Sequence, residues 1–147
     1  MPELHALSAG ELIRRYRRRE LSPVEVARDA LARIDRLNPI VNAFVLVDRE
    51  AALAAAAAAE ARWKQGAPVG LVDGVPTTIK DNVWAKGWPS RRGSRTSDPA
   101  PIAADAPAVA SAAARSTSTN ALTIGFNRSM RASASRATST GESSRRR

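Results

Sequence analysis

The chain has 147 residues and a formal net charge of +9, with 23 Lys and Arg residues against 14 Asp and Glu residues. This length is typical of a single domain, and the absence of cysteine excludes disulfides, a thiolate nucleophile and metal sites with cysteine ligands. The one histidine, His5, excludes a metal site built from several histidines, and no run of 18 uncharged apolar residues is present that could span a membrane.

Two helices are predicted in the first 40 residues. Ser8, with Glu11 three residues later, forms a capping-box pattern that predicts a helix over about 9–20. The same start signal recurs in Ser22-Pro23-Val24-Glu25, which places proline at the first helical position. An apolar stripe at helical spacing follows it, and we expect this second helix to end at Asn38-Pro39 because proline disfavours helix in the residue before it.

A short strand and a third helix are predicted next. Residues 40–47 are mostly apolar and partly β-branched, which favours a strand or an extended link. Asp48 is a suitable N-cap for a helix through the Ala-rich residues 51–59. We expect this helix to close near Lys64, with Gly66 just beyond its end.

A lysine follows the next β-prone segment. Residues 75–79 favour a buried strand, and Lys80-Asp81-Asn82 comes directly after it. A lysine at such a position is most often solvated. If it is buried instead, loss of hydration disfavours its charged form, and a neutral lysine can accept a proton from a hydroxyl, which activates a serine without histidine. Position alone leaves both interpretations open.

The composition changes sharply near Ala110. Residues 111–147 contain seven Arg, one acidic residue and 14 Ser and Thr, so they carry +6 of the net charge and residues 1–110 carry only +3. Because so few large apolar side chains cannot offset the entropy of ordering the backbone, we expect 111–147 to be a disordered basic tail. Asp105 and Pro107 resemble a helix start, but no apolar stripe continues after Ala110.

The string from residue 74 onward resembles the amidase signature family, which includes bacterial amidases, fatty-acid amide hydrolases and the A subunit of the tRNA-dependent amidotransferase. The resemblance covers about residues 5–110, and the stretch from Trp88 to Thr96 is more similar to bacterial amidases than to the amidotransferase protein. Its segments are Gly74-Val-Pro-Thr-Thr-Ile-Lys-Asp-Asn82, which is the most specific, then Gly87-Trp-Pro-Ser90, Gly93-Ser94 and Asp105-Ala-Pro-Ala-Val109.

The resemblance implies hydrolysis of the carbon–nitrogen bond of a small-molecule amide by a Ser–cis-Ser–Lys triad without metal or cofactor, with Lys80 matching the lysine. In that scheme the neutral lysine deprotonates a bridging serine, and this serine deprotonates the nucleophile that attacks the carbonyl. Asp81 and Asn82 are then expected to orient the loop after the strand. Ser94 receives no catalytic role.

The chain departs from the family pattern after the lysine. Both triad serines of the family lie in a segment of the form Gly-Gly-Ser-Ser-Gly-Gly-Ser, which this sequence does not contain. The nearest string, Thr140-Gly-Glu-Ser-Ser144, has one glycine and a carboxylate, so we assign it no role and expect the chain alone to be inactive. The break near Ala110 suggests a shift of reading frame, which translation of the other two frames would test.

We therefore expect an α/β fold in which residues 1–110 form the N-terminal helices and first strands of the amidase-signature mixed sheet, truncated, followed by the tail 111–147. The start of the chain lacks the pattern of a secretory signal, so we expect a cytoplasmic protein with no membrane contact. The alternative is a non-catalytic basic protein that binds nucleic acid or an acidic partner through the Arg-rich tail. Its charge favours only non-specific, salt-sensitive contact with nucleic acid.

Overall fold

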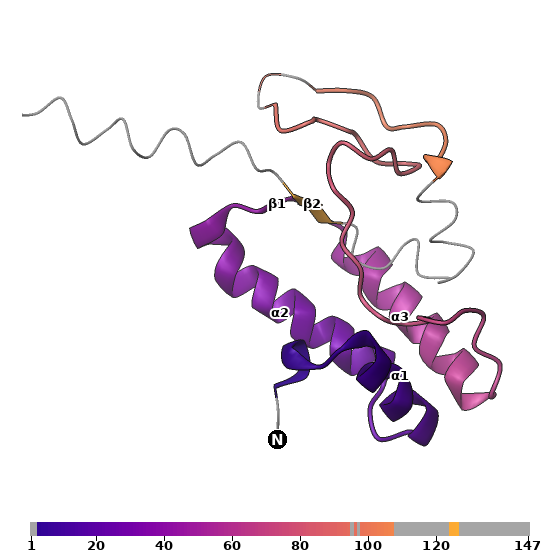
Figure 1. The fold of residues 1–147 in the computed structure, drawn as a ribbon. Helices are drawn as coiled ribbons and strands as arrows, with labels where there is room; N and C mark the ends of the chain where they lie inside the picture. Colours follow the sequence, from indigo (N-terminus) through magenta and orange to yellow (C-terminus); the bar gives the residue numbers. More distant parts are fainter. Residues whose placement is uncertain (1–2, 95, 97, 108–123, 127–147) are drawn as a thin grey trace, which may run out of the picture.

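The computed structural model describes residues 3–94, 96, 98–107 and 124–126. Helices α2 and α3 lie side by side, α1 packs near one end of them, and a long irregular segment follows α3 (Figure 1). This arrangement confirms the α/β expectation, and none of the described helices is long and apolar enough to cross a membrane. The elements in chain order are η1 (Leu4–Ala6), α1 (Ala9–Arg18), α2 (Pro23–Val41), β1 (Phe44–Val47), α3 (Arg49–Lys64) and β2 (Ile124–Phe126).

The cap of α1 uses half of the predicted capping box. The backbone N–H of Glu11 donates to the Ser8 side chain at 3.2 Å. The Glu11 carboxylate pairs with Arg15 and Arg14 instead of returning to the cap, and these guanidinium groups hold the pKa of Glu11 below its usual value. The helix ends at Arg18, two residues before the predicted end, because Arg19 adopts a left-handed conformation with φ 59°.

Helix α2 has the complete predicted start but extends past its predicted end. Ser22 and Glu25 exchange both hydrogen bonds of the capping box. The expected stop at Asn38-Pro39 is wrong, because the helix continues through Pro39 to Val41. The Asn38 side chain explains the extension, since it accepts from Phe44 N at 2.8 Å and donates to Phe44 O at 3.0 Å, which ties the final turn to β1.

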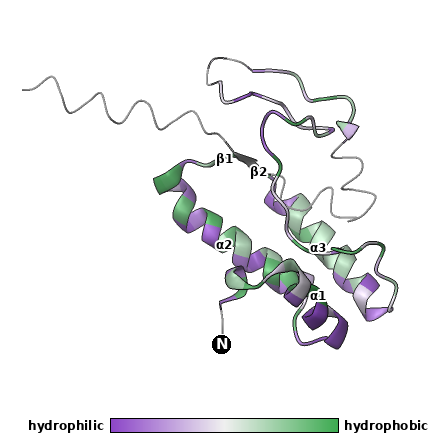
Figure 2. Cartoon of the chain, in the orientation of Figure 1, coloured by the Kyte–Doolittle hydropathy of each residue, from purple (hydrophilic) through white to green (hydrophobic). Residues whose placement is uncertain are grey.

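Helix α3 follows its prediction closely. The Asp48 side chain accepts from Ala51 N at 3.0 Å, the helix ends at Lys64, and Gly66 has the expected positive φ of 71°. Figure 2 shows α1 as strongly hydrophilic and α3 as mostly pale, in keeping with its alanines. These small side chains allow α2 and α3 to approach closely. The buried side chains between the two helices are Ala27, Leu31, Ile34, Ala52 and Ala56.

Strands β1 and β2 pair antiparallel, with Phe44 opposite Phe126, Val47 opposite Ile124 and an irregularity between the two pairs. The strand predicted over 40–47 is therefore confirmed in its second half. Of the tail expected over 111–147, the structure describes residues 124–126, which pair with β1. The rest of that segment, and the helix expected after Pro107, lie outside the described residues.

A cluster of buried hydrogen bonds around Asp73 joins α1, α3 and the segment that follows α3. Asp73 is fully buried and accepts from Arg62 Nε at 2.8 Å and Nη2 at 2.7 Å, an interaction that raises the pKa of Arg62. Trp63 Nε1 donates to the Asp73 carbonyl at 3.0 Å, and Tyr16 donates to the carbonyl of Gly74 at 3.3 Å. These contacts fix the point from which the family-like segment departs.

Candidate functional site

The segment 74–82, which carries the most specific resemblance, begins at a constrained glycine. Gly74 has φ 80°, and a Cβ there would lie 2.7 Å from Cγ of Pro23 and 3.1 Å from Cβ of Ala59. A side chain at this position would therefore clash as well as strain the backbone. Val75 follows it into the core, where it packs with Leu12 and other buried side chains.

The predicted strand over 75–79 is not formed, which corrects the sequence interpretation. Val75 N donates to Val72 O at 3.0 Å, so its backbone closes a turn instead of a ladder. Pro76 has no N–H to donate, and Thr77 and Thr78 are exposed. The segment runs without regular secondary structure, because none of the described strands pairs with it.

Lys80 lies at the end of this segment and its side chain is exposed, so the burial expected of a neutral lysine is not found here. Its carbonyl accepts from Val83 N at 2.8 Å, which closes a turn over 80–83. The residue borders a small cavity of about 20 Å³ between β1, represented by Val45 and Leu46, and residues 88–90. The structure thus places Lys80 beside β1 without covering it.

Asp81 clamps the loop that faces Lys80. The residue is 8% exposed, and its carboxylate accepts from Arg91 N at 3.0 Å and from Gly93 N at 2.7 Å. The hydroxyl of Ser90 donates to the Asp81 carbonyl at 2.6 Å. The Asp81 carboxylate thus holds the backbone of residues 91–93, while the side chain of Asn82 is exposed.

Ser90 is the residue that sequence reasoning missed. It borders the same cavity as Lys80 and connects residues 80–83 to the following loop. The only sequence signal is its place in the family-like string. The hydroxyl of Ser94 lies 3.2 Å from Oγ1 of Thr96 and also accepts from Thr96 N.

Replacement of Asp81 by alanine should release this loop. We expect amide hydrogen exchange at Arg91 and Gly93 to accelerate by about tenfold or more, because each loses a bond to a charged acceptor. Asp105→Ala is the matched control, since its carboxylate accepts from Lys86 N and should affect that amide alone. An unchanged rate of amide exchange at Gly93 in a folded Asp81→Ala chain would contradict the proposal that Asp81 holds this loop in place.

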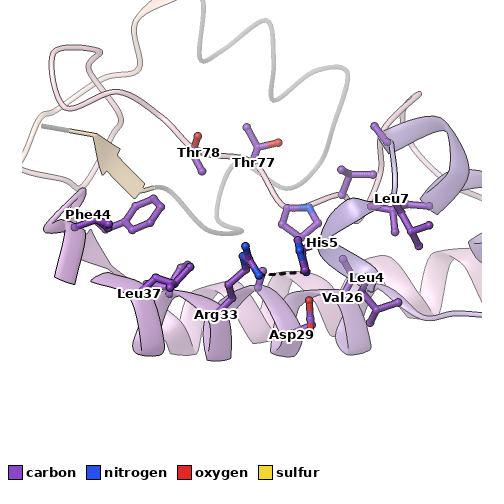
Figure 3. Close-up of a pocket in the computed structure, with 17 residues that line it drawn as sticks. Leu4, His5, Leu7, Val26, Asp29, Arg33, Leu37, Phe44, Thr77 and Thr78 are labelled. Atoms are coloured by element: carbon purple, nitrogen blue, oxygen red, sulfur yellow. Dashed lines mark hydrogen bonds between the residues drawn. The ribbon is translucent and has the colours of Figure 1, made fainter. Parts of the chain in front are cut away.

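His5 and Trp63 both contact other side chains of the described body. His5 lies 3.2 Å from Glu3 and 3.3 Å from Nη1 of Arg33 (Figure 3). Trp63 packs against Tyr16 with ring centroids 6.0 Å apart. Within the ranges that the structure describes, no three His, Asp or Glu side chains gather in a way that could hold a metal ion. The Arg-rich tail proposed for nucleic-acid contact lies outside those ranges, except for β2.

Comparison with known proteins places this arrangement in a family. The Amidase family model matches residues 25–133, which is more than half of the chain. The matched range extends past Ala110, where the sequence resemblance was expected to end.

Similarity to individual proteins is confined to a small part of each. The chain is 44% identical over 95 residues to the A subunit of glutamyl-tRNA(Gln) amidotransferase from Salinispora arenicola, and 42% identical over 93 residues to its counterpart from Myxococcus xanthus. These matches cover 65% and 63% of this chain but only 19% of each relative. This chain therefore spans about a fifth of the length of the curated relatives it matches.

The similarity to a solved structure is likewise confined to one part of it. The crystal structure of a bacterial aryl acylamidase of the amidase signature family matches 82% of this chain with a TM-score of 0.67 and 34% identity. The matched region is 25% of the aryl acylamidase chain. The described body thus corresponds to one part of a larger fold.

Proposed function

The chain belongs to the Amidase family, and we propose that it supplies the lysine-bearing part of an active site that hydrolyses the carbon–nitrogen bond of a small-molecule amide. The segment 74–82 carries this proposal, because it holds the family-like lysine inside the matched range. Lys80 is the proton acceptor. Asp81 is a positioning residue, since its carboxylate fixes the loop beside that lysine.

The proposed chemistry requires groups beyond this lysine. A neutral Lys80 takes a proton from a bridging serine, which takes one from the nucleophilic serine as it attacks the amide carbonyl. Backbone N–H groups stabilise the oxyanion, the amine leaves with a proton, and water then releases the acid from the acyl-enzyme. The sequence of this chain contains no Gly/Ser-rich segment to supply the two serines.

The exposure of Lys80 supports a further element of the proposal, namely that the chain alone is inactive. An ammonium loses its charge readily only where burial removes its hydration. The side chain of Lys80 is exposed and bordered only by a small cavity. The site can therefore work only when further residues bury Lys80 and bring the two serines next to it.

A hybrid enzyme tests this function. Residues 1–107 of this chain would replace the corresponding residues of the bacterial aryl acylamidase, whose remaining sequence provides the rest of the domain. We expect the hybrid to hydrolyse an aryl acylamide, with amine release as the readout, and the 147-residue chain alone to release none.

Two results would contradict the proposal. Amine release by the purified chain alone would show that its site is already complete. A hybrid that is folded by circular dichroism and gives a cooperative melt, yet releases no amine, would show that residues 1–107 do not form a working part of the site. The unaltered aryl acylamidase is the control for the assay.

A further inference from the structure

The turn that carries Lys80 and the loop that follows it are joined by hydrogen bonds in both directions. The carboxylate of Asp81 accepts from the backbone N–H groups of Arg91 and Gly93. In the opposite direction, the hydroxyl of Ser90 donates to the backbone carbonyl of Asp81 at 2.6 Å. Because a side chain from each segment is bonded to the backbone of the other, a shift of either segment breaks at least one of these bonds.

The bond from Ser90 acts on the backbone next to Lys80. The carbonyl of Lys80 accepts from Val83 N at 2.8 Å, and the next carbonyl along the chain, that of Asp81, accepts from Ser90. Each peptide group is planar, so a bond to its carbonyl restricts the orientation of the whole group. Ser90 therefore helps to fix the backbone from which the side chain of Lys80 extends.

Ser90 follows a part of the chain that is held by other contacts. Within the irregular segment after α3 (Figure 1), Gly87 N donates to Ile102 O at 2.9 Å, and Ile102 N donates to Trp88 O at 3.0 Å. Ser90 comes two residues after Trp88, so this backbone pairing restricts where its hydroxyl can lie. The hydroxyl in turn connects this paired backbone to the turn of Lys80.

The surroundings of Ser90 leave little room for solvent. Ser90 is half-buried and borders, together with Lys80, the cavity of about 20 Å³ beside β1. This volume is about enough for one water molecule. A water in place of the hydroxyl would satisfy the Asp81 carbonyl but would not connect it to residue 90. The hydroxyl is therefore needed for the connection itself.

We propose that Ser90 is a positioning residue for the amine of Lys80 and acts through the backbone of Asp81. The inference rests on the proposed function, in which Lys80 accepts the proton of a serine. It gives Ser90 no catalytic role, because the hydroxyl donates its proton to the Asp81 carbonyl. Displacement of a reacting group by about 1 Å can cost about a hundredfold in rate. Since the Asp81 carboxylate still holds the loop, we expect loss of the hydroxyl to cost about tenfold.

The first measurement uses the 147-residue chain. Ser90→Ala should accelerate amide hydrogen exchange at Val83 by about threefold or more, because the turn that this amide closes loses its connection to residue 90. Ser90→Thr retains the hydroxyl and should keep the rate within about twofold of the parent chain. Thr96→Val is the matched control, since it removes a hydroxyl of the same segment that contacts Ser94, and it should leave exchange at Val83 unchanged.

The second measurement uses the hybrid with residues 1–107. Ser90→Ala should lower kcat about tenfold and leave KM within about twofold, because a displaced proton acceptor slows the reaction without weakening the binding of the amide. Ser90→Thr should restore kcat to within about threefold of the parent hybrid. Thr96→Val should leave both constants unchanged.

An unchanged exchange rate at Val83 in Ser90→Ala would overturn the proposal, whether or not the hybrid is active. In an active hybrid, an unchanged kcat in Ser90→Ala, or a loss of kcat that Ser90→Thr does not restore, would also overturn it. A folded hybrid that releases no amine with Ser90 intact would refute the proposed function and with it the role of Ser90 in catalysis. Exchange at Val83 is measured without the hybrid, so the two failures are distinguishable.

Discussion

Replacement of Asp73 by alanine is expected to lower the free energy of unfolding by about 3–5 kcal/mol, the usual cost of breaking a buried ion pair by removing one partner. Asp73 is fully buried, and its carboxylate accepts both guanidinium bonds of Arg62 as well as Val69 N at 3.3 Å. The substitution leaves these donors without their acceptor and opens a cavity. Because a small domain is stabilised by only about 5–15 kcal/mol in total, a large share of the stability of this body should be lost.

Urea unfolding followed by circular dichroism measures this effect, with Asp98→Ala as the matched control. Asp98 also pairs with an arginine, Arg91, at 2.9 Å, but its side chain is 90% exposed and should contribute less than about 1 kcal/mol. The double variant Arg62→Met/Asp73→Ala should be less destabilised than the sum of the single variants. Equal losses of unfolding free energy in Asp73→Ala and Asp98→Ala would contradict a stabilising role of the hydrogen-bond cluster around Asp73.

Local signals in the sequence predicted the helices well. Ser8, Ser22 and Asp48 each cap the helix for which they were proposed, because an N-cap depends on residues only three positions away. The predicted end of α2 was wrong because it depends on a contact outside the helix. The side chain of Asn38 pairs with Phe44 across the turn to β1, and this contact stabilises a final turn that the proline rule alone would forbid.

Non-local partners explain the other differences. Residues 75–79 have the composition of a strand, but a strand requires a hydrogen-bonded partner, and none of the described strands pairs with them. The burial of Lys80 likewise depends on what packs over it. The resemblance pointed to Asp81 as a loop-orienting residue, but its partners, Arg91 N and Gly93 N, follow from the structure alone. The match of Ile124–Phe126 to β1 spans too great a separation for sequence patterns to predict.

The second large effect concerns Lys80 in the hybrid enzyme. Lys80→Ala should reduce kcat for the aryl acylamide by about a thousandfold or more, because loss of one member of a catalytic triad disables the others. Lys86→Ala is the control, since Lys86 is an exposed lysine on the same irregular segment and should change kcat less than about twofold. The melting temperatures of both variants are measured beside that of the unsubstituted hybrid, so that the rates are compared on equally folded proteins.

The ratio of amine-release rates between the hybrid and its Lys80→Ala variant, measured at saturating substrate on equally folded proteins, is the most direct test of the account. A ratio of about a thousand or more, with Lys86→Ala near unity, is the predicted result. A Lys80→Ala hybrid that releases amine as fast as its parent would contradict the assignment of this lysine to the chemistry.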